Sequence, residues 1–359
     1  MADTSELIRL AAPKAPPFAI PTWLRPVTVP AGRYWLAGGW ASFDVVDILQ
    51  RDAAGYSVSR CTLDEIMATA DNRNLASTMI DRLTGKRPAW AGISLDQPTI
   101  MGILNVTPDS FSDGGQHNLP ARAVAAGRAM IEAGAGIIDI GGESTRPGAD
   151  PVTRNQELAR VLPPLTGLKD AGTVLSIDTR HAEVMTRATA AGAGIINDVN
   201  GLRGEGALDA AAATGAAVAI MHMQGTPETM QQDPQYGFAP AEIYEFLEQR
   251  IASAERAGIP RDQIAIDPGF GFGKSPAHNL SLIGWTAMFH GLGVPILVGV
   301  SRKSSIASLS AGEAADQRLA GSLGLAMAAV AQGCQLVRVH DVAETRQALA
   351  IQMALMAST

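Results

Sequence analysis

Carboxylate and carboxamide side chains directly follow three short apolar runs of the chain. Asp178, Asn197 and Asp267 each come at the end of such a run. An Asp accepts hydrogen bonds and an Asn both donates and accepts them, so together they suit the edge of a heteroaromatic ring. Each residue alone could equally cap the helix that follows it. Three such groups at one site are hard to explain by capping, which favours a binding site.

Positively charged side chains follow two later apolar runs. Residues 301–305 read Ser-Arg-Lys-Ser-Ser at an expected helix start, where backbone N–H groups favour an anion and basic side chains are otherwise unfavourable. Arg338 and His340 are two residues apart on an expected strand, so they point the same way. A buried arginine in a strand is rare without an anionic partner. Both segments therefore indicate a bound anion.

Two glycine-containing loops carry further polar groups. Residues 105–115 hold a carboxamide, two carboxylates and three hydroxyls, which suit Mg²⁺ and a diphosphate if the loop is more than a solvated turn. Residues 141–148 place Arg146 where its guanidinium can contact phosphate or carboxylate oxygens. The surrounding glycines let backbone N–H groups approach an anion, which favours a functional arginine over an idle one.

The segment 269–275, Gly-Phe-Gly-Phe-Gly-Lys-Ser, ends like a nucleotide-binding P-loop. The first glycine of that motif would fall at Pro268, however, and Pro276 stands where the helix of a P-loop should donate N–H groups. We therefore interpret the segment as a loop over a flat aromatic substrate, with Phe272 as a packing surface.

The elements that must position these groups recur after Pro98. Short β-branched runs alternate with alanine-rich helical stretches at a spacing of roughly 30 residues, the size of a βα unit. The expected strands are residues 99–104, 137–140, 174–177, 195–197, 218–221, 264–266, 296–298 and 336–339. Eight such units predict an α/β fold, the (β/α)8 or TIM barrel, whose active sites lie at the C-terminal ends of the strands.

The first quarter of the chain has a different texture. Residues 1–30 are rich in Pro and Ala and predict a semi-rigid arm. Residues 31–95 combine short β-like runs with a helical stretch near residues 63–83, which predicts a small α+β extension of unknown role. The barrel is expected to occupy residues 96–359.

Composition narrows the class of protein. The net charge of −7 argues against broad binding to nucleic acid or to a membrane surface, because phosphates would be repelled. Cys61 and Cys334 are too few for a disulfide scaffold or a zinc cluster, and no apolar leader is seen, so we expect a cytoplasmic protein. The histidines show no metal-ligand spacing, and we interpret His222 as a packing residue.

On these motifs, residues 98–355 resemble the dihydropteroate synthase family. The matching stretches are residues 103–115, 141–148, 267–274, 301–304 and 338–341. The resemblance implies a transferase of folate biosynthesis that condenses a pterin-methyl diphosphate with p-aminobenzoate. It further implies Mg²⁺ as cofactor, a homodimer, and inhibition by sulfonamides, which compete with p-aminobenzoate. The N-terminal extension resembles nothing in this family.

The resemblance also implies a role for each matched residue. The pterin would be bound by Asp178, Asn197, Met221, Asp267 and Lys303. The diphosphate would be bound by Asn105, Arg146, Arg338 and His340, and the metal by Asn105 and Asp113. The p-aminobenzoate site would comprise Phe111, Thr145, Arg146, Pro147, Phe272 and Ser304. The catalytic set would be Asp178, Lys303, Arg338 and His340.

Two alternatives stay open at this point. A pterin-dependent methyltransferase barrel would share the pterin-binding carboxylates but would not need a diphosphate site, so Lys303 and Arg338 argue against it. A catalytically silent partner subunit would be expected to lose residues from the loops at 105–115 and 141–148, and both loops are intact here.

Overall fold

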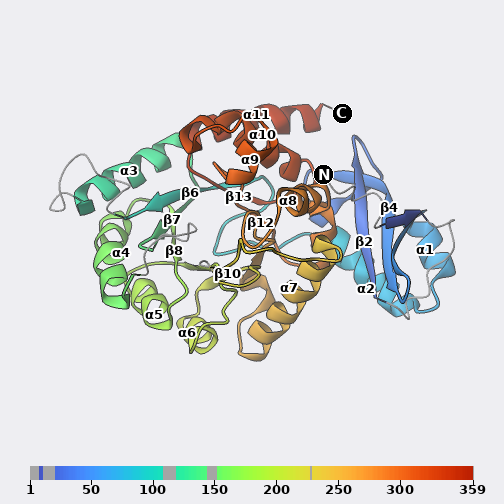
Figure 1. Cartoon of the computed structure of the whole chain (residues 1–359), viewed down its shortest axis with the longest axis horizontal. Helices are drawn as coiled ribbons and strands as arrows, with labels where there is room; N and C mark the ends of the chain where they lie inside the picture. The colour runs from blue at the N-terminus through green and yellow to red at the C-terminus, as the bar shows by residue number, and fades with distance from the viewer. Residues whose placement is uncertain (1–7, 11–20, 108–118, 144–151, 227–228, 359) are drawn as a thin grey trace.

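The computed structural model of the chain describes residues 8–10, 21–107, 119–143, 152–226 and 229–358. It consists of a barrel of parallel strands surrounded by helices, with a smaller β-rich extension packed against one side (Figure 1). No helix in these ranges is long and apolar enough to cross a membrane.

Eight parallel strands form the barrel, in the order β11-β10-β9-β8-β7-β6-β13-β12. Their bounds are β6 (Thr99–Asn105), β7 (Ile137–Gly141), β8 (Val174–Asp178), β9 (Ile195–Asp198), β10 (Ala217–Met221), β11 (Ile264–Asp267), β12 (Leu297–Val298) and β13 (Leu336–Val339). A parallel bridge between Ile266 and Ile296 joins the two ends of this order. The predicted (β/α)8 barrel is therefore confirmed.

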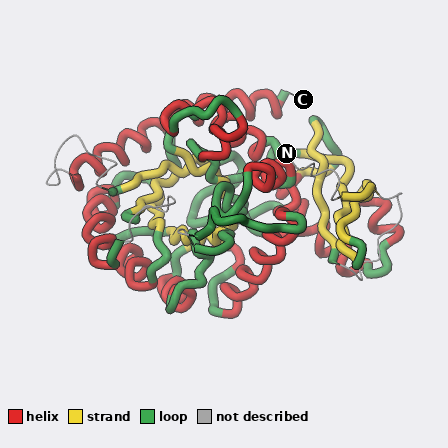
Figure 2. The backbone as a smooth tube through the Cα atoms, in the orientation of Figure 1, coloured by secondary structure: helices red, strands yellow, loops and turns green. Residues whose placement is uncertain are grey.

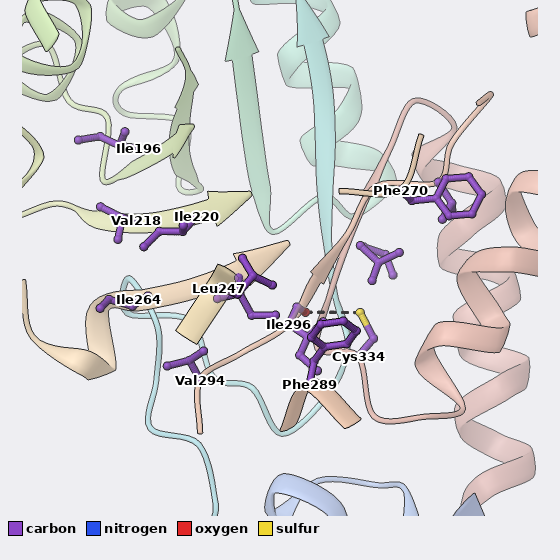
Figure 3. Packing of buried hydrophobic residues seen from close by; sticks show 14 of the residues in the cluster. Ile196, Val218, Ile220, Leu247, Ile264, Phe270, Phe289, Val294, Ile296 and Cys334 are labelled. Atoms are coloured by element: carbon purple, nitrogen blue, oxygen red, sulfur yellow. Dashed lines mark hydrogen bonds between the residues drawn. The ribbon is translucent and has the colours of Figure 1, made fainter. Parts of the chain in front are cut away.

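Helices follow the strands and cover the outside of the barrel, as the helical segments in Figure 2 show. Their bounds are α3 (Leu119–Ala133), α4 (Arg154–Leu168), α5 (Ala182–Ala190), α6 (Ala207–Thr214), α7 (Ala239–Arg256), α8 (Pro276–Gly284), α9 (Ser304–Leu309), α10 (Leu319–Val330) and α11 (Val342–Ala357), with 3-10 turns η5 (Arg261–Gln263), η6 (Thr286–Leu292) and η7 (Ala315–Gln317). Figure 3 shows part of the core between strands and helices, where Cys334 Sγ lies 3.4 Å from the Ile296 carbonyl oxygen.

The inner face of the barrel changes from apolar to polar along strands β7 and β13. On β7, Ile137, Asp139 and Gly141 share one face because strand side chains alternate. Ile137 belongs to an apolar cluster at the N-terminal end of the barrel, whereas Asp139 lies two residues nearer the C-terminal mouth. Strand β13 repeats the pattern, with Leu336 in the same cluster and Arg338 above it. The strand period of two puts these residues on the inner face, and their order along the strand puts the polar ones nearer the C-terminal end.

Trp90 closes the N-terminal end of the barrel. Its side chain is fully buried among residues that begin the strands, such as Ile137 of β7 and Leu336 of β13. Its indole N–H donates to the Gln263 carbonyl at 3.1 Å. The segment between the extension and β6 thereby serves as a plug for the barrel.

Removing this plug should be costly. Trp90→Ala should lower the free energy of unfolding by about 3–5 kcal/mol, because it opens a large cavity that the rigid strand ends cannot fill. Trp35, which is 51% exposed, supplies the matched control, and Trp35→Ala should change stability by no more than about 0.5 kcal/mol. Urea denaturation measures both; equal effects would show that Trp90 does not act as a plug.

The extension contains a five-stranded sheet in the order β1-β5-β4-β2, with β3 also paired to β4. Its elements are β1 (Ile8–Leu10), β2 (Thr22–Val29), β3 (Tyr34–Trp35), η2 (Leu36–Gly38), β4 (Ser42–Asp52), β5 (Gly55–Thr62), α1 (Leu63–Thr69) and α2 (Arg73–Thr84). The predicted α+β character is confirmed.

The predicted arm over residues 1–30 needs a correction. Residues 22–29 form strand β2, which pairs antiparallel with β4 along its whole length. Pro26 is compatible with this strand because β2 lies at the edge of the sheet, where a missing N–H costs little. The proline-rich composition therefore concealed an edge strand, and the division of the chain at residue 95 stays a prediction.

Candidate active site

Polar side chains from several strands meet at the C-terminal mouth of the barrel. Asn105 ends β6 and Asp178 ends β8, on either side of β7. A Cβ atom on Gly141 would lie 3.5 Å from both Asn105 Oδ1 and Asp178 Cβ. Glycine at the end of β7 therefore leaves room for the two polar side chains to approach each other.

Asp139 is the centre of the polar network below this mouth. Its carboxylate is completely buried and accepts hydrogen bonds from three other strands. Ser176 Oγ donates to Oδ1 at 2.6 Å, while Asn197 Nδ2 and Arg338 Nε donate to Oδ2 at 3.0 and 2.6 Å. A buried carboxylate needs such partners, because an unpaired charge in the barrel would be strongly destabilising.

Asp139 was missed in the sequence analysis, which treated residues 137–140 as one apolar strand. The available signal was a lone carboxylate within Ile-Ile-Asp-Ile, since charged residues are rarely buried without a partner. The alternation of strand side chains would then have placed Asp139 on the same face as Gly141, inside the barrel.

Arg338 links two carboxylates across the barrel. Besides its bond to Asp139, its Nη2 donates to Asp178 Oδ2 at 2.7 Å, and its side chain is 19% exposed. Sequence analysis predicted an anionic partner for a strand arginine, and these two carboxylates are such partners. The predicted contact between Arg338 and a diphosphate is a separate matter and stays a prediction.

The pKa of Asp178 is unusual for a carboxyl group. Burial raises this pKa from 3.8 to about 7, against the opposing effect of Arg338 and with the support of nearby Asp139. Because the folded chain holds this proton more tightly than the unfolded chain, the group stabilises the fold most below pH 3.8. That contribution is lost as the pH rises towards 7.

A pH profile tests this environment. A deprotonated Asp178 accepts hydrogen bonds through both of its oxygens, whereas protonation turns one of them into an O–H donor. We therefore expect kcat/KM for a substrate bound through this carboxylate to fall as the pH drops below about 7. Asp178→Asn should lose both most of the activity and this acidic limb. If Asp178→Asn shows the same fall of kcat/KM at low pH, the titrating group is not Asp178.

Asp267, Lys303 and Phe272 lie on the opposite side of the mouth. Asp267 is buried, and its Oδ1 accepts the Gly269 N–H at 2.7 Å. Burial raises the pKa of Asp267, and the charge of Lys303 is among the effects that lower it. Lys303 Nζ lies 3.9 Å from the centre of the Phe272 ring, a cation–π arrangement. A carboxylate, a cation and an aromatic ring therefore face the same region.

Met221 belongs to a small apolar cluster beside these residues. It is buried with Val199, Met223 and Met230, and Phe272 packs against the cluster. Methionine side chains adapt to irregular apolar surfaces, which suits the wall of a pocket for a flat ring.

His340 lies against Ser301 at the β12–β13 side of the mouth. Ser301 Oγ is 3.0 Å from His340 Nδ1 and also accepts the His340 backbone N–H at 3.2 Å. Ser304 is exposed at the first position of α9, directly after Lys303. Neighbouring Arg302 is tied to Asp341, with Nε 3.0 Å from Oδ2, and is thus engaged within the protein.

Lys274, which gave the sequence its P-loop appearance, points into the protein. It is 3% exposed, and its Nζ donates to the Phe272 carbonyl at 2.8 Å and lies 3.0 Å from His222 Nδ1. Burial holds the pKa of His222 well below its usual value, and the ring packs edge-on against Phe246 at 4.8 Å. Both side chains therefore make internal contacts, which agrees with the packing role expected for His222.

Several predicted site residues lie outside the described part of the chain. They are Phe111, Asp113, Thr145, Arg146 and Pro147. Within the described residues, no group of three His, Cys, Asp or Glu side chains is placed to hold a metal ion.

Comparison with known proteins agrees with this geometry. A family model described as pterin binding enzyme matches residues 101–340, more than half of the 359 residues. The dihydropteroate synthase of Escherichia coli (strain K12) is 49% identical over 263 residues, which are 72% of this chain and 93% of that protein.

Two solved structures of the Xanthomonas albilineans dihydropteroate synthase are also similar. The one with 4-aminobenzoic acid has a TM-score of 0.71 at 49% identity and covers 74% of this chain and 97% of that chain. The one in complex with 7,8-dihydropteroate has a TM-score of 0.68 at 47% identity, with coverage of 74% and 96%.

The closed (β/α)8 barrel has acidic groups around its mouth, and the family model matches most of the barrel. Together these findings define the class of protein. The chain belongs to the family of pterin-binding enzymes. Within that family it groups with the dihydropteroate synthases, which are transferases.

Proposed function

We propose that this chain condenses (7,8-dihydropterin-6-yl)methyl diphosphate with p-aminobenzoate to give 7,8-dihydropteroate and diphosphate. The observation that carries the proposal is the polar mouth, where Asp178, Asn197 and Asp267 near the strand ends lie with Arg338 on β13 and with Lys303 directly before α9. The similarity to structures that contain 4-aminobenzoic acid and 7,8-dihydropteroate supports the choice of substrates.

The pterin ring carries several N–H donors and ring nitrogens. Asp178 and Asp267 would accept hydrogen bonds from the donors, while Asn197, oriented by Asp139, would offer a carboxamide oxygen. Lys303 would donate to an acceptor of the ring, and Met221 would pack against one face.

In the bond-making step, the amine nitrogen of p-aminobenzoate attacks the pterin methylene carbon. The carbon–oxygen bond to the diphosphate breaks, the diphosphate leaves with the electron pair, and the amine releases its proton. Positive charge that builds on the methylene and ring would be stabilised by the Asp178 carboxylate. The weakly basic aryl amine needs little help from a base, so departure of the diphosphate is the demanding event.

The leaving diphosphate needs cationic and hydrogen-bonding partners. We assign it to Asn105, Arg146, Arg338 and His340. To bind it, Arg338 would turn part of its guanidinium from Asp178 towards the mouth, and the exposed fraction of its side chain supports such access. Charge-assisted bonds from a guanidinium suit phosphate oxygens.

Mg²⁺ is commonly held by one or two protein oxygens together with phosphates of a substrate. Asn105 fits this role because its half-buried Oδ1 lies at the rim of the mouth beside Gly141. Asp113 is the second proposed ligand. Bound there, the ion would offset negative charge on the departing diphosphate.

The p-aminobenzoate site is proposed to comprise Phe111, Thr145, Arg146, Pro147, Phe272 and Ser304. Phe272 supports this placement because it lies beside Lys303 at the mouth, and Ser304 because it is exposed directly after Lys303. Sulfonamides, which resemble p-aminobenzoate, would then compete for the same site.

We further propose a homodimer in the cytoplasm. Helices α8 to α11 lie side by side (Figure 1), and their outer surface includes the exposed apolar residues Leu280, Leu309, Ile351 and Leu355. Such a surface favours burial against a second copy, which light scattering would test. Both cysteines are free and buried, which suits a reducing compartment.

The proposed reaction is tested by diphosphate release from purified protein, the pterin diphosphate and Mg²⁺, with and without p-aminobenzoate. We expect release only when p-aminobenzoate is present. Binding of the pterin diphosphate without any turnover would overturn the proposal and favour a catalytically silent subunit.

A further inference from the structure

We propose that the N-terminal extension positions the active site, and that Tyr56 is the residue through which it acts. In this view the extension braces the loop before α7, and that loop in turn holds the backbone on both sides of Phe272. The inference rests on the proposed function, because Phe272 is assigned there to the p-aminobenzoate site.

The first step is an aromatic contact between the extension and the barrel. Tyr56, on β5, packs against Phe238 with ring centres 5.5 Å apart, and Trp23 packs behind Tyr56 at 6.3 Å. Phe238 is the residue directly before α7 and also meets Trp285 edge-on at 5.0 Å. Tyr56 and Phe238 are both buried. Phe238, directly before α7, is therefore held between Tyr56 of the extension and Trp285 of the barrel.

Charged contacts hold the extension in this position. Arg51 makes a two-pronged ion pair with Glu245 on α7, with nitrogen–oxygen distances of 2.7 and 3.2 Å. Arg25 lies 4.3 Å from the centre of the Trp285 ring and donates to the Gly284 carbonyl at 3.3 Å. Paired, planar contacts of this kind restrict relative movement better than single surface ion pairs do.

The second step runs from Phe238 to the loop after β11. Two residues before Phe238, the Tyr236 hydroxyl donates to the Gly273 carbonyl at 2.9 Å. From the same segment, Gln231 Nε2 donates to the Gly271 carbonyl at 2.8 Å. The segment 229–238 thus binds the backbone immediately before and immediately after Phe272.

These two bonds matter because the loop is rich in glycine. Gly271 and Gly273 have φ angles of +84° and +62°, a left-handed conformation that glycine adopts readily. Having no side chains, these two residues cannot fix the loop by packing. Together with the bond from Lys274 to the Phe272 carbonyl, the contacts from segment 229–238 therefore set the direction of Phe272 and the position of its ring beneath Lys303. The family match begins at residue 101, so the brace comes from outside the shared barrel.

The contact chain makes a specific prediction for Tyr56. Tyr56→Ala should raise the KM for p-aminobenzoate about five- to tenfold with a smaller change in kcat, because the loop carrying Phe272 is loosened. Tyr56→Phe keeps the ring against Phe238 and should restore nearly normal kinetics. Trp40→Phe is the matched control, since it removes a 2.8 Å bond from the extension to the Val330 carbonyl without touching the brace.

Hydrogen exchange of the intact protein gives a readout that does not depend on turnover. In Tyr56→Ala, amides of segments 229–238 and 268–275 should exchange faster, while those of α4 should not change. Tyr236→Phe, which loses only the bond to Gly273, should loosen segment 268–275 alone. Combined with Tyr56→Ala, it should add little further, because both act through one path.

The outcomes separate the two proposals. Faster exchange together with a raised KM supports the brace, and faster exchange in a protein without turnover would support the brace while overturning the proposed function. A Tyr56→Ala variant with a lower melting temperature, unchanged exchange at 268–275 and unchanged KM would show that the extension only adds stability.

Discussion

Replacing Asp139 with asparagine should lower kcat/KM for the pterin diphosphate by about 100-fold, since small displacements of reacting groups cost this much. The variant keeps the shape of the side chain but removes its charge. The amide oxygen in place of Oδ2 could still accept from Asn197 and Arg338, but without the negative charge that strengthens both bonds. Asn197 would be held less firmly, and Asp178 would be the remaining anionic partner of Arg338 among these contacts.

Steady-state kinetics over both substrates measure this effect, and urea denaturation shows whether the variant folds. Ser176→Ala is the control, because it removes only the donor to the other carboxylate oxygen and should change kcat/KM by less than about threefold. Asp139→Asn with nearly normal kinetics would show that the network serves folding alone.

Replacing Lys303 with methionine should weaken pterin diphosphate binding about 10- to 100-fold, the usual worth of a charge-assisted hydrogen bond. Methionine keeps an apolar stem against Phe272 and Gly271 but removes the cation that faces Asp267. With that charge gone, the pKa of Asp267 should rise further, so less of the carboxylate is available to accept from the ring.

Isothermal titration with the pterin diphosphate measures the loss. Lys86→Met is the control, because Lys86 lies in the extension, where it forms an exposed ion pair with Asp96 remote from the mouth. Unchanged affinity in Lys303→Met, with the protein folded, would remove Lys303 from the pterin site.

Much of the barrel follows from local sequence. Buried parallel strands read as apolar runs, so all eight could be located, and the fold rule then placed Asp178 and Asp267 at one mouth. The network around Asp139 could not be read in the same way, because it joins four strands that are distant in sequence.

Long-range packing was likewise hidden in the extension. Strand β2 contains Pro26, and a proline usually argues against a strand. Only the pairing of β2 with β4 shows that β2 is an edge strand. The contact of Tyr56 with Phe238 depends on how the extension packs against the barrel, which local sequence does not reveal. The roles of Phe111, Asp113, Thr145, Arg146 and Pro147 stay predictions, because these residues lie outside the described ranges.

The central claim is that the amine of p-aminobenzoate displaces diphosphate at the pterin methylene carbon. The most direct test uses pterin diphosphate with a heavy-oxygen label in the bridge between methylene and phosphorus, followed by mass spectrometry of the products. We expect unlabelled 7,8-dihydropteroate and the whole label in the released diphosphate. Label retained on a pterin alcohol, with no dihydropteroate formed, would show phosphate-ester hydrolysis and contradict it.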